Sequence, residues 1–159
     1  MSKELKVGDP APKFSAVAIG SGYPEEGKLV SLGDFEGKNV VLYFYPKDDT
    51  PGCTKQACGL RDAWGQLSQK AVIFGVSVDD AKSHHDFIDK FSLPFPLLSD
   101  QEKKMVEAYN VWVEKSMYGK TYMGTDRSTF VIGPDGNLRA ILRRVKPEEH
   151  VDALLAELK

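Results

Sequence analysis

Cys53 and Cys58 are the residues of this chain whose chemistry is most distinctive. They are its two cysteines, and they come just after a loop that contains Thr50. The loop follows an apolar and aromatic run, residues 39–45, which predicts a strand buried on both faces. Beyond the loop, apolar residues recur with helical spacing from residue 53 to about 69. Cys53 is therefore expected at the start of a helix, where unpaired backbone N–H groups and the helix dipole favour an anion.

A thiolate in such a position is suited to attack one oxygen of a peroxide and to become a sulfenic acid. The reaction also needs groups that orient the peroxide and stabilise its developing negative charge. The Thr50 hydroxyl can accept a hydrogen bond from the peroxide and donate one to sulfur, while Pro46 and Pro51 restrict the loop and shield the sulfur from water. An arginine would supply a permanent positive charge, but the sequence has several, and spacing does not select one.

The elements around this segment predict an α/β fold of the thioredoxin-like type. Two short strands within residues 14–32 precede the main sheet, and residues 71–78 form a second buried strand. The later elements are a helix over about 80–91 capped by Asp79 and Asp80, an extended segment at 93–98, a helix beginning near Asp100, a loop at 112–126, a hairpin of 129–132 with 138–142, and a final helix after Pro147. The fold is thus predicted to have an N-terminal strand extension, a closing β-hairpin and a C-terminal helix, all in one domain spanning 1–159.

Composition narrows the classes of function. The net charge of −2 gives no reason to expect nucleic acid or an anionic membrane as a partner. No apolar run approaches the length of a membrane span, and the first residues lack the apolar centre of a secretory signal, so a cytoplasmic location is expected. In a cytosolic chain of this size the two cysteines are expected to change redox state rather than to serve as a structural disulfide.

The cysteine segment resembles the peroxiredoxin active site. Its pattern Pro-x-x-x-Thr/Ser-x-x-Cys is filled by Pro46, Thr50 and Cys53. The longer run Phe-Tyr-Pro-Lys-Asp-Asp-Thr-Pro-Gly-Cys-Thr at 44–54, with a second cysteine five residues after the first, is similar to the bacterioferritin comigratory protein/peroxiredoxin Q group. The similarity extends over nearly the whole chain, including residues 8–14, 118–124 and 127–132.

This resemblance implies roles for further residues. Arg127 would support the thiolate and the peroxide, and Gln56 would be a secondary polar contact from the helix. Together with Gln56, Pro46 and Gly52 would line the substrate pocket. Cys58 would resolve the oxidised cysteine as an intramolecular disulfide, and a thioredoxin-type dithiol would reduce that disulfide. The expected substrates are hydrogen peroxide and organic hydroperoxides, and no cofactor is expected.

Geometry adds a condition on the cysteine pair. Residues five apart in an ideal helix have Cα atoms roughly 8–9 Å apart and point in different directions. A disulfide needs Cα atoms less than about 7 Å apart. Cys53 and Cys58 therefore cannot bond while both lie in an intact helix, so its first turns are predicted to unwind, eased by Gly52 and Gly59. Since the disulfide would form within one chain, catalysis requires no dimer, and a monomer is expected.

Plainer interpretations exist for each residue type. Cys53 can be a buried structural thiol, Cys58 can simply pack, and Thr50 can be a helix N-cap. The sequence predicts no metal site, because the C-x-x-C and H-x-x-x-H spacings are absent. The histidines are instead expected on helix surfaces: His84, His85 and His150.

Two other functions compete with a peroxidase. A thiol–disulfide oxidoreductase typically uses Cys-x-x-Cys, and the longer spacing here is unfavourable to it. A redox sensor would use the same cysteine oxidation to change a binding partner, without turnover. Insulin reduction in the absence of peroxide would identify the first, and a single oxidation event without sustained peroxide consumption would identify the second.

Overall fold

The apolar run at 39–45 forms the strand from which the site is built. The structure, a computed structural model, describes residues 4–158. In it β3 (Val40–Phe44) is buried at every position, as a strand covered on both faces must be. It pairs in parallel with β4 (Val72–Ser77) and antiparallel with β8 (Ser128–Ile132).

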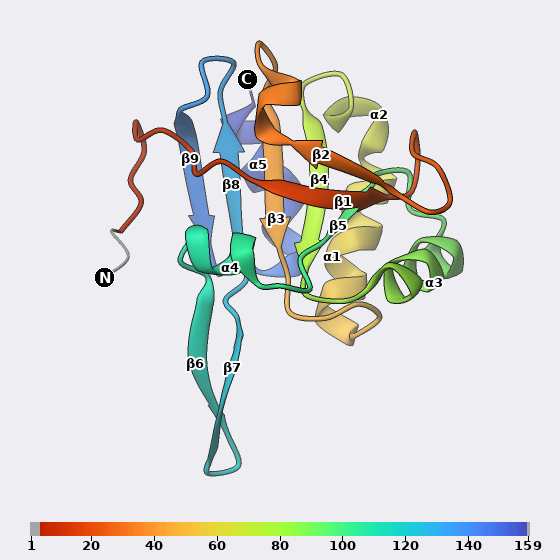
Figure 1. The fold of residues 1–159 in the computed structure, drawn as a ribbon, viewed down its shortest axis with the longest axis vertical. Coiled ribbons are helices and arrows are strands. Elements are labelled where there is room, and N and C mark those ends of the chain that lie inside the picture. Colours follow the sequence, from red (N-terminus) through yellow and green to blue (C-terminus); the bar gives the residue numbers. More distant parts are fainter. Residues whose placement is uncertain (1–3, 159) are drawn as a thin grey trace.

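Seven strands form the main sheet, in the order β2-β1-β5-β4-β3-β8-β9 (Figure 1). The predicted N-terminal strands are β1 (Ser15–Ile19) and β2 (Lys28–Ser31), which pair with each other and extend the sheet beyond β5 (Leu97–Ser99). The predicted closing hairpin is β8 with β9 (Leu138–Arg143). The strand and hairpin predictions are therefore confirmed for the main sheet.

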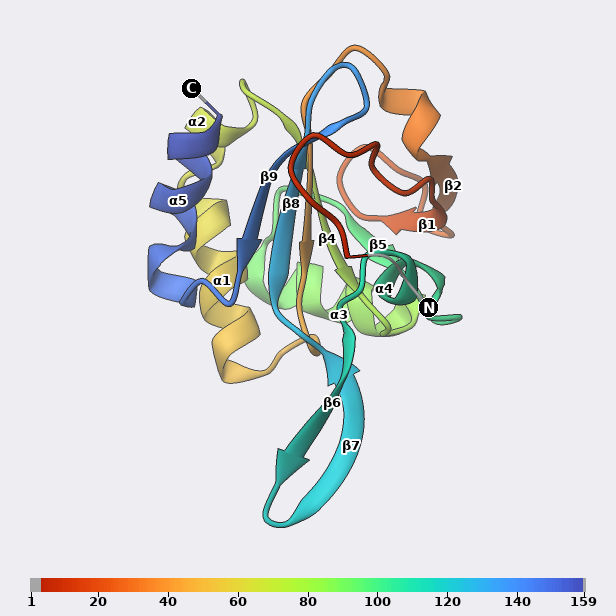
Figure 2. The same cartoon turned by 90° about the vertical axis from the view of Figure 1, so that its left-hand side faces the viewer.

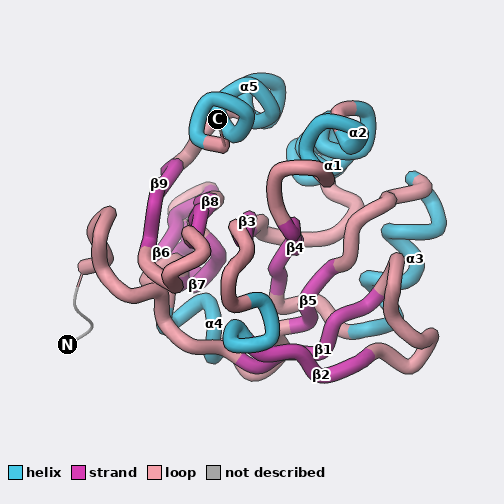
Figure 3. The backbone as a smooth tube through the Cα atoms, turned by 90° about the horizontal axis from the view of Figure 1, so that it is seen from above, coloured by secondary structure: helices cyan, strands magenta, loops and turns pink. Residues whose placement is uncertain are grey.

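Alternation along β3 divides the core into two layers. Val40, Leu42 and Phe44 face one layer, and Val41 and Tyr43 face the other, because successive side chains of a strand point to opposite faces. The helices are α1 (Pro51–Asp62), α2 (Trp64–Leu67), α3 (Ala81–Phe91), α4 (Lys104–Ala108) and α5 (His150–Glu157), with short 3-10 turns at Leu32–Phe35 and Pro147–Glu149. Seen from above, α1, α2 and α5 lie on one side of the sheet and α4 on the other (Figure 3).

The segment 112–126 was predicted as a loop, and this prediction was wrong. It forms a two-stranded hairpin of β6 (Trp112–Met117) and β7 (Lys120–Thr125), turned by Tyr118 and Gly119, both with positive φ. The hairpin projects away from the body, from the end of the sheet at which β3 leads into α1 (Figures 1 and 2). Its strands were missed because most of their residues are exposed, so they carry no apolar alternation.

Helix boundaries differ from the predictions in two places. The helix expected over 53–69 breaks at Ala63 into α1 and α2. The helix expected near Asp100 begins at Lys104, because the Asp100 carboxylate lies before it and accepts from the N–H groups of Met105 and Val106. Within residues 4–158, no helix is both long enough and apolar enough to cross a membrane.

Candidate active site

Cys53 is the third residue of α1 and is almost fully buried, with 2% of its surface exposed. The polypeptide leaves β3, turns through residues 45–50 and enters the helix at Pro51, whose fixed φ suits a first helical position. The backbone N–H groups of a first turn have no partner within their own helix. The sulfur is therefore placed where an anion is favoured, as the sequence predicted.

Arg127 approaches the sulfur from a strand distant in sequence. Because β8 runs antiparallel to β3 with Ser128 opposite Phe44, the residue just before β8 lies beside the end of β3. There the Arg127 Nη2 donates to Cys53 Sγ at 3.3 Å. A Cβ atom on Gly52 would lie 3.2 Å from that same nitrogen, so the absence of a side chain at residue 52 leaves room for the guanidinium.

Gln56, one turn after Cys53, fixes the other side of the guanidinium. Its Oε1 accepts from Arg127 Nη1, and its Nε2 lies 3.2 Å from Nδ1 of His150, the first residue of α5. The His150 Nε2 is in turn 2.8 Å from the hydroxyl of Thr129 on β8. Burial, helped by the charge of Arg127, lowers the pKa of His150 to about 4. The expectation that His150 lies on a surface is wrong, because α5 turns this residue toward the sheet and only 1% of it is exposed.

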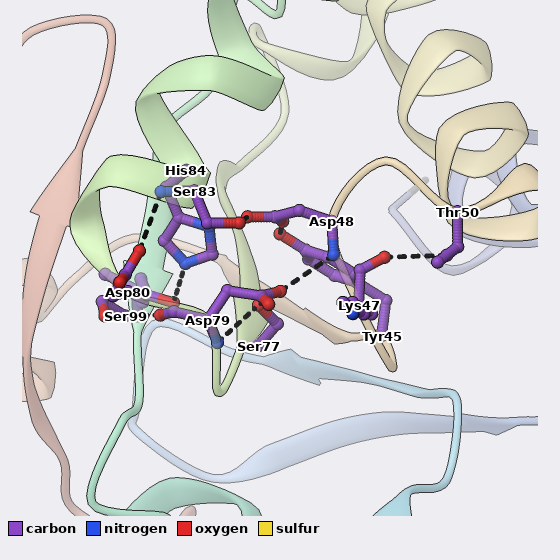
Figure 4. A network of polar contacts seen from close by, with 11 residues as sticks. Tyr45, Lys47, Asp48, Thr50, Ser77, Asp79, Asp80, Ser83, His84 and Ser99 are labelled. Atoms are coloured by element: carbon purple, nitrogen blue, oxygen red, sulfur yellow. Dashed lines mark hydrogen bonds and ion pairs between the residues drawn. The ribbon is translucent and has the colours of Figure 1, made fainter.

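Thr50 occupies the N-cap position of α1 with an extended backbone. Its hydroxyl donates to the carbonyl of Lys47 at 2.8 Å, and within the described chain its side chain does not cap the helix (Figure 4). Pro46 is partly buried at the start of the same loop. The plainer interpretation of Thr50 as a side-chain N-cap is therefore not what the structure contains, and its action on a peroxide stays a prediction.

A polar network anchors the loop between β3 and α1 (Figure 4). Asp48, in the loop, accepts hydrogen bonds from the Tyr45 hydroxyl at 2.5 Å and from the Ser83 hydroxyl at 2.8 Å. Its carboxylate also lies 2.7 Å from Nδ1 of His84. Asp79 accepts from the backbone N–H of Asp48 at 2.8 Å. Burial and the nearby Asp48 charge raise the pKa of Tyr45, so its hydroxyl remains a donor. These bonds fix the loop that leads to Cys53.

The structure therefore contradicts the expectation for His84. It lies on α3 with no exposed surface, its Nε2 3.0 Å from the Leu98 carbonyl. Its neighbour Asp80 caps α3 as predicted, accepting from the backbone of Ser83, whereas Asp79 belongs to the loop network. Asp48, Asp79 and His84 also have ligand-type atoms all within 4.8 Å of one another, a spacing that suits a cation. The hydrogen bonds that join Asp48 to His84 and to Asp79 explain why these atoms lie close together.

A second cation lies near the thiol. Lys115 lies in β6 opposite Tyr122, and its Nζ donates to the carbonyl of Thr125 at the base of the hairpin. Burial lowers the pKa of Lys115, partly offset by the charge of Asp126, with smaller influences from Arg127 and Cys53. No motif or spacing in the sequence marks this lysine as part of the site.

Cys58 lies in the same intact helix as Cys53 and is half-buried, and both are free thiols. α1 packs against α5 along this length, with a Cβ on Gly59 at ordinary contact distance from Val151. The structure thus brings Cys53, Gly52, Gln56 and Arg127 together, and leaves Cys58 on the same helix, five residues away.

Comparison with known proteins shows the family to which the chain belongs. The model of the AhpC/TSA family matches residues 7–141. A curated protein of Coxiella burnetii described as a putative peroxiredoxin bcp is 46% identical over 97% of this chain and 99% of its own, and peroxiredoxin Bcp of Bacillus subtilis is 44% identical over 98% and 96%.

Solved structures show the same fold. Peroxiredoxin Q of Xanthomonas campestris superposes with a TM-score of 0.82 at 38% identity, covering 91% of this chain and 89% of its own. A mutant of Xylella fastidiosa PrxQ gives a TM-score of 0.87 at 33% identity, covering 99% and 97%. The fold is the thioredoxin-like fold of peroxiredoxins, as predicted. The chain belongs to the AhpC/TSA family and, within it, to the bacterioferritin comigratory protein/peroxiredoxin Q group.

Proposed function

We propose that this peroxiredoxin reduces hydroperoxides with Cys53 as the attacking thiolate and Cys58 as the resolving thiol. The observation that carries the proposal is the contact of the Arg127 guanidinium with the buried Cys53 sulfur at the start of α1. A thiolate is stabilised there by a permanent cation and by unpaired N–H groups. The same groups can stabilise negative charge on the peroxide oxygens as the bond between them breaks.

The first step oxidises Cys53. The thiolate attacks one peroxide oxygen, the O–O bond breaks, and the other oxygen leaves as hydroxide or alkoxide and takes up a proton. Cys53 becomes a sulfenic acid, having lost two electrons to the peroxide. Thr50 and Pro46 define the approach to the sulfur in this proposal, with the Thr50 hydroxyl turning from the Lys47 carbonyl to the peroxide.

The second step joins the two cysteines. The Cys58 thiol gives up its proton and attacks the sulfenic sulfur, a sulfur–sulfur bond forms as the S–O bond breaks, and the hydroxyl takes up a proton and leaves as water. Because both cysteines lie in α1, its first turns must unwind to bring them within bonding distance. A thioredoxin-type dithiol then reduces the disulfide by exchange through a mixed disulfide.

Organic hydroperoxides are proposed as substrates beside hydrogen peroxide. A solved structure of the bacterioferritin comigratory protein of Xanthomonas campestris, 37% identical with a TM-score of 0.81, is described in terms of alkyl peroxide reduction activity. That likeness supports the same substrate class here. The proposed cycle uses one chain, so the active form is proposed to be a monomer.

Intact mass after one equivalent of hydrogen peroxide tests the assignment. We expect the reduced wild-type protein to lose two hydrogens, Cys58→Ser to gain one oxygen, and Cys53→Ser to stay unchanged. Oxidation of wild type no faster than that of free cysteine would refute the peroxidase proposal. Hydrogen exchange of residues 53–60 tests the unwinding separately, because equal protection in the reduced and disulfide forms would contradict it.

A further inference from the structure

A chain of hydrogen bonds leads from the C-terminal helix to the reactive sulfur. It runs from Thr129 to His150, from His150 to Gln56, from Gln56 to Arg127 and from Arg127 to Cys53. Thr129, His150 and Gln56 are each at most 2% exposed, so water does not compete with these bonds. The chain joins α5, α1 and β8, three elements that are far apart in the sequence.

The donors and acceptors of this chain admit one arrangement. A guanidinium can only donate, so the Gln56 atom that faces Arg127 must be its carbonyl oxygen. The amide nitrogen of Gln56 therefore faces His150 and donates to Nδ1, which must carry no proton. The remaining ring proton is on Nε2 and is donated to Thr129. One neutral tautomer of His150 thus fits, and it holds the Gln56 amide in the orientation that accepts from Arg127.

We infer that His150 is a positioning residue for the thiolate site: by fixing the Gln56 amide it holds the Arg127 guanidinium against Cys53. The inference rests on the proposed function of Cys53 and Arg127. His150 acts through Gln56 and touches neither sulfur nor substrate.

Packing alone does not require a histidine here. His150 lies on the buried side of α5 with Leu154, where an apolar side chain would fill the space but would leave the buried Gln56 amide and Thr129 hydroxyl without this partner. A buried imidazole is costly unless its nitrogens are hydrogen-bonded. Its only other contact of note among the described residues is an edge-on approach to the Tyr43 ring, with centroids 5.8 Å apart. The two ring nitrogens of His150 therefore serve to bond Gln56 and Thr129.

A double-mutant cycle tests whether His150 acts through Gln56. The variants are His150→Leu, Gln56→Leu and the double variant, with His85→Leu on α3 as the matched loss of another imidazole. Two quantities are measured on the reduced proteins: the thiolate fraction of Cys53 at fixed pH, from its ultraviolet absorbance in a Cys58→Ser background, and the rate of Cys53 oxidation by hydrogen peroxide. We expect His150→Leu to lower the oxidation rate roughly 10-fold, the effect of losing one hydrogen bond around a charged group.

In the Gln56→Leu background, His150→Leu is expected to change neither quantity further, because the path to Arg127 is already cut. His150→Asn, whose short side chain can still present an acceptor to Gln56, is expected to recover most of the thiolate fraction. His85→Leu is expected to leave both quantities at the wild-type level.

Independent, additive losses from His150→Leu and Gln56→Leu would overturn the inference, because they would show a general structural effect. A thiolate fraction unchanged in His150→Leu would also overturn it. If wild type reacts with peroxide no faster than free cysteine, the proposed function fails, but the thiolate measurement still decides the role of His150.

Discussion

Two buried histidines, His84 and His150, belong to the two polar networks around the start of α1, and they differ in the partners that their rings contact. His84 lies between two acceptors, the Asp48 carboxylate and the Leu98 carbonyl. His150 lies between a donor, the Gln56 amide nitrogen, and a hydroxyl. Asp48 also accepts from the Tyr45 and Ser83 hydroxyl groups, so the His84 ring is one of several partners around a buried carboxylate. Equal burial thus accompanies different surroundings: His84 faces a carboxylate and a carbonyl, and His150 faces an amide and a hydroxyl.

The two rings also hold different parts of the site. His84 fixes the loop that precedes α1, through Asp48, whereas His150 fixes the second turn of α1, through Gln56. The loop network contains charged groups in a buried setting, and the α1 network contains neutral groups around one arginine. We therefore expect the networks to respond differently to substitution and to pH.

Loss of the His84 ring should have the largest effect. In His84→Leu the Asp48 carboxylate stays buried without its ring partner, and we expect the free energy of unfolding to fall by about 3–5 kcal/mol. Urea unfolding at neutral pH measures the change. The double variant Asp48→Asn with His84→Leu removes the buried carboxylate together with its ring partner and should recover part of the loss. A decrease of less than about 1 kcal/mol in His84→Leu would show that the ring contributes little to holding the buried Asp48 carboxylate.

Acid should act chiefly on the His150 network. The unfolded chain protonates this ring near pH 6.5, whereas the folded protein does so near pH 4. Between these values the unfolded state binds more protons, so the contribution of neutral His150 is complete above pH 6.5 and is lost as pH falls toward 4. The loss should total about 3 kcal/mol.

Urea unfolding of wild type and of His150→Leu across this pH range measures that contribution. The variant has no ring to protonate, so its stability should fall less between pH 6.5 and pH 4 than that of wild type. Parallel curves for the two proteins would show that His150 does not titrate in this way.

Removal of the Tyr45 hydroxyl should have a smaller effect on the charged network. Tyr45→Phe deletes one of the donors to the Asp48 carboxylate and leaves the ring stacked on Tyr43. We expect the free energy of unfolding to fall by about 2 kcal/mol, the usual value for a hydrogen bond to a charged group. Tyr23→Phe, at a hydroxyl remote from this loop, is the control for the substitution itself.

The smallest effect is expected at the far end of the neutral network. Thr129→Val keeps the β-branched shape on β8 and removes the hydroxyl that accepts from His150. A neutral hydrogen bond contributes about 1 kcal/mol, so the melting temperature should fall slightly. If the free energy of unfolding falls as much in Thr129→Val as in Tyr45→Phe, the bonds of the neutral network are as strong as those to the Asp48 carboxylate, and the contrast between the two networks fails.

The sequence predicted the local structure around Cys53 well because its signals are local. A buried apolar strand, a loop with two prolines and a helix start were sufficient to place Cys53. The family resemblance added Arg127 and Gln56, which spacing could not select, since β8 reaches the site only through sheet pairing. No short stretch of sequence predicts which distant strands pair with each other.

The sequence around His84 and His150 carries a signal of their burial, because each lies in line with apolar residues of its helix. His84 stands three, four and seven residues before Phe87, Ile88 and Phe91, so it continues the apolar side of α3. His150 precedes Leu154 and Leu158 by four and eight residues in the same manner. A polar residue on such a stripe is expected to be buried, but its partners come from other elements. The hairpin at 112–126 lacked even this signal, because it packs few side chains onto the core.

The projecting hairpin of β6 and β7 offers a practical site for protein engineering. Its tip, with Tyr118 97% exposed, makes no contribution to either layer of the core. A loop tip of this kind is where chains accept inserted peptides and where proteases cut first. A fluorescent tag placed between Tyr118 and Gly119 should therefore leave the main sheet folded. Such a tag would make the tip a fixed reference point for following movements of α1 by energy transfer.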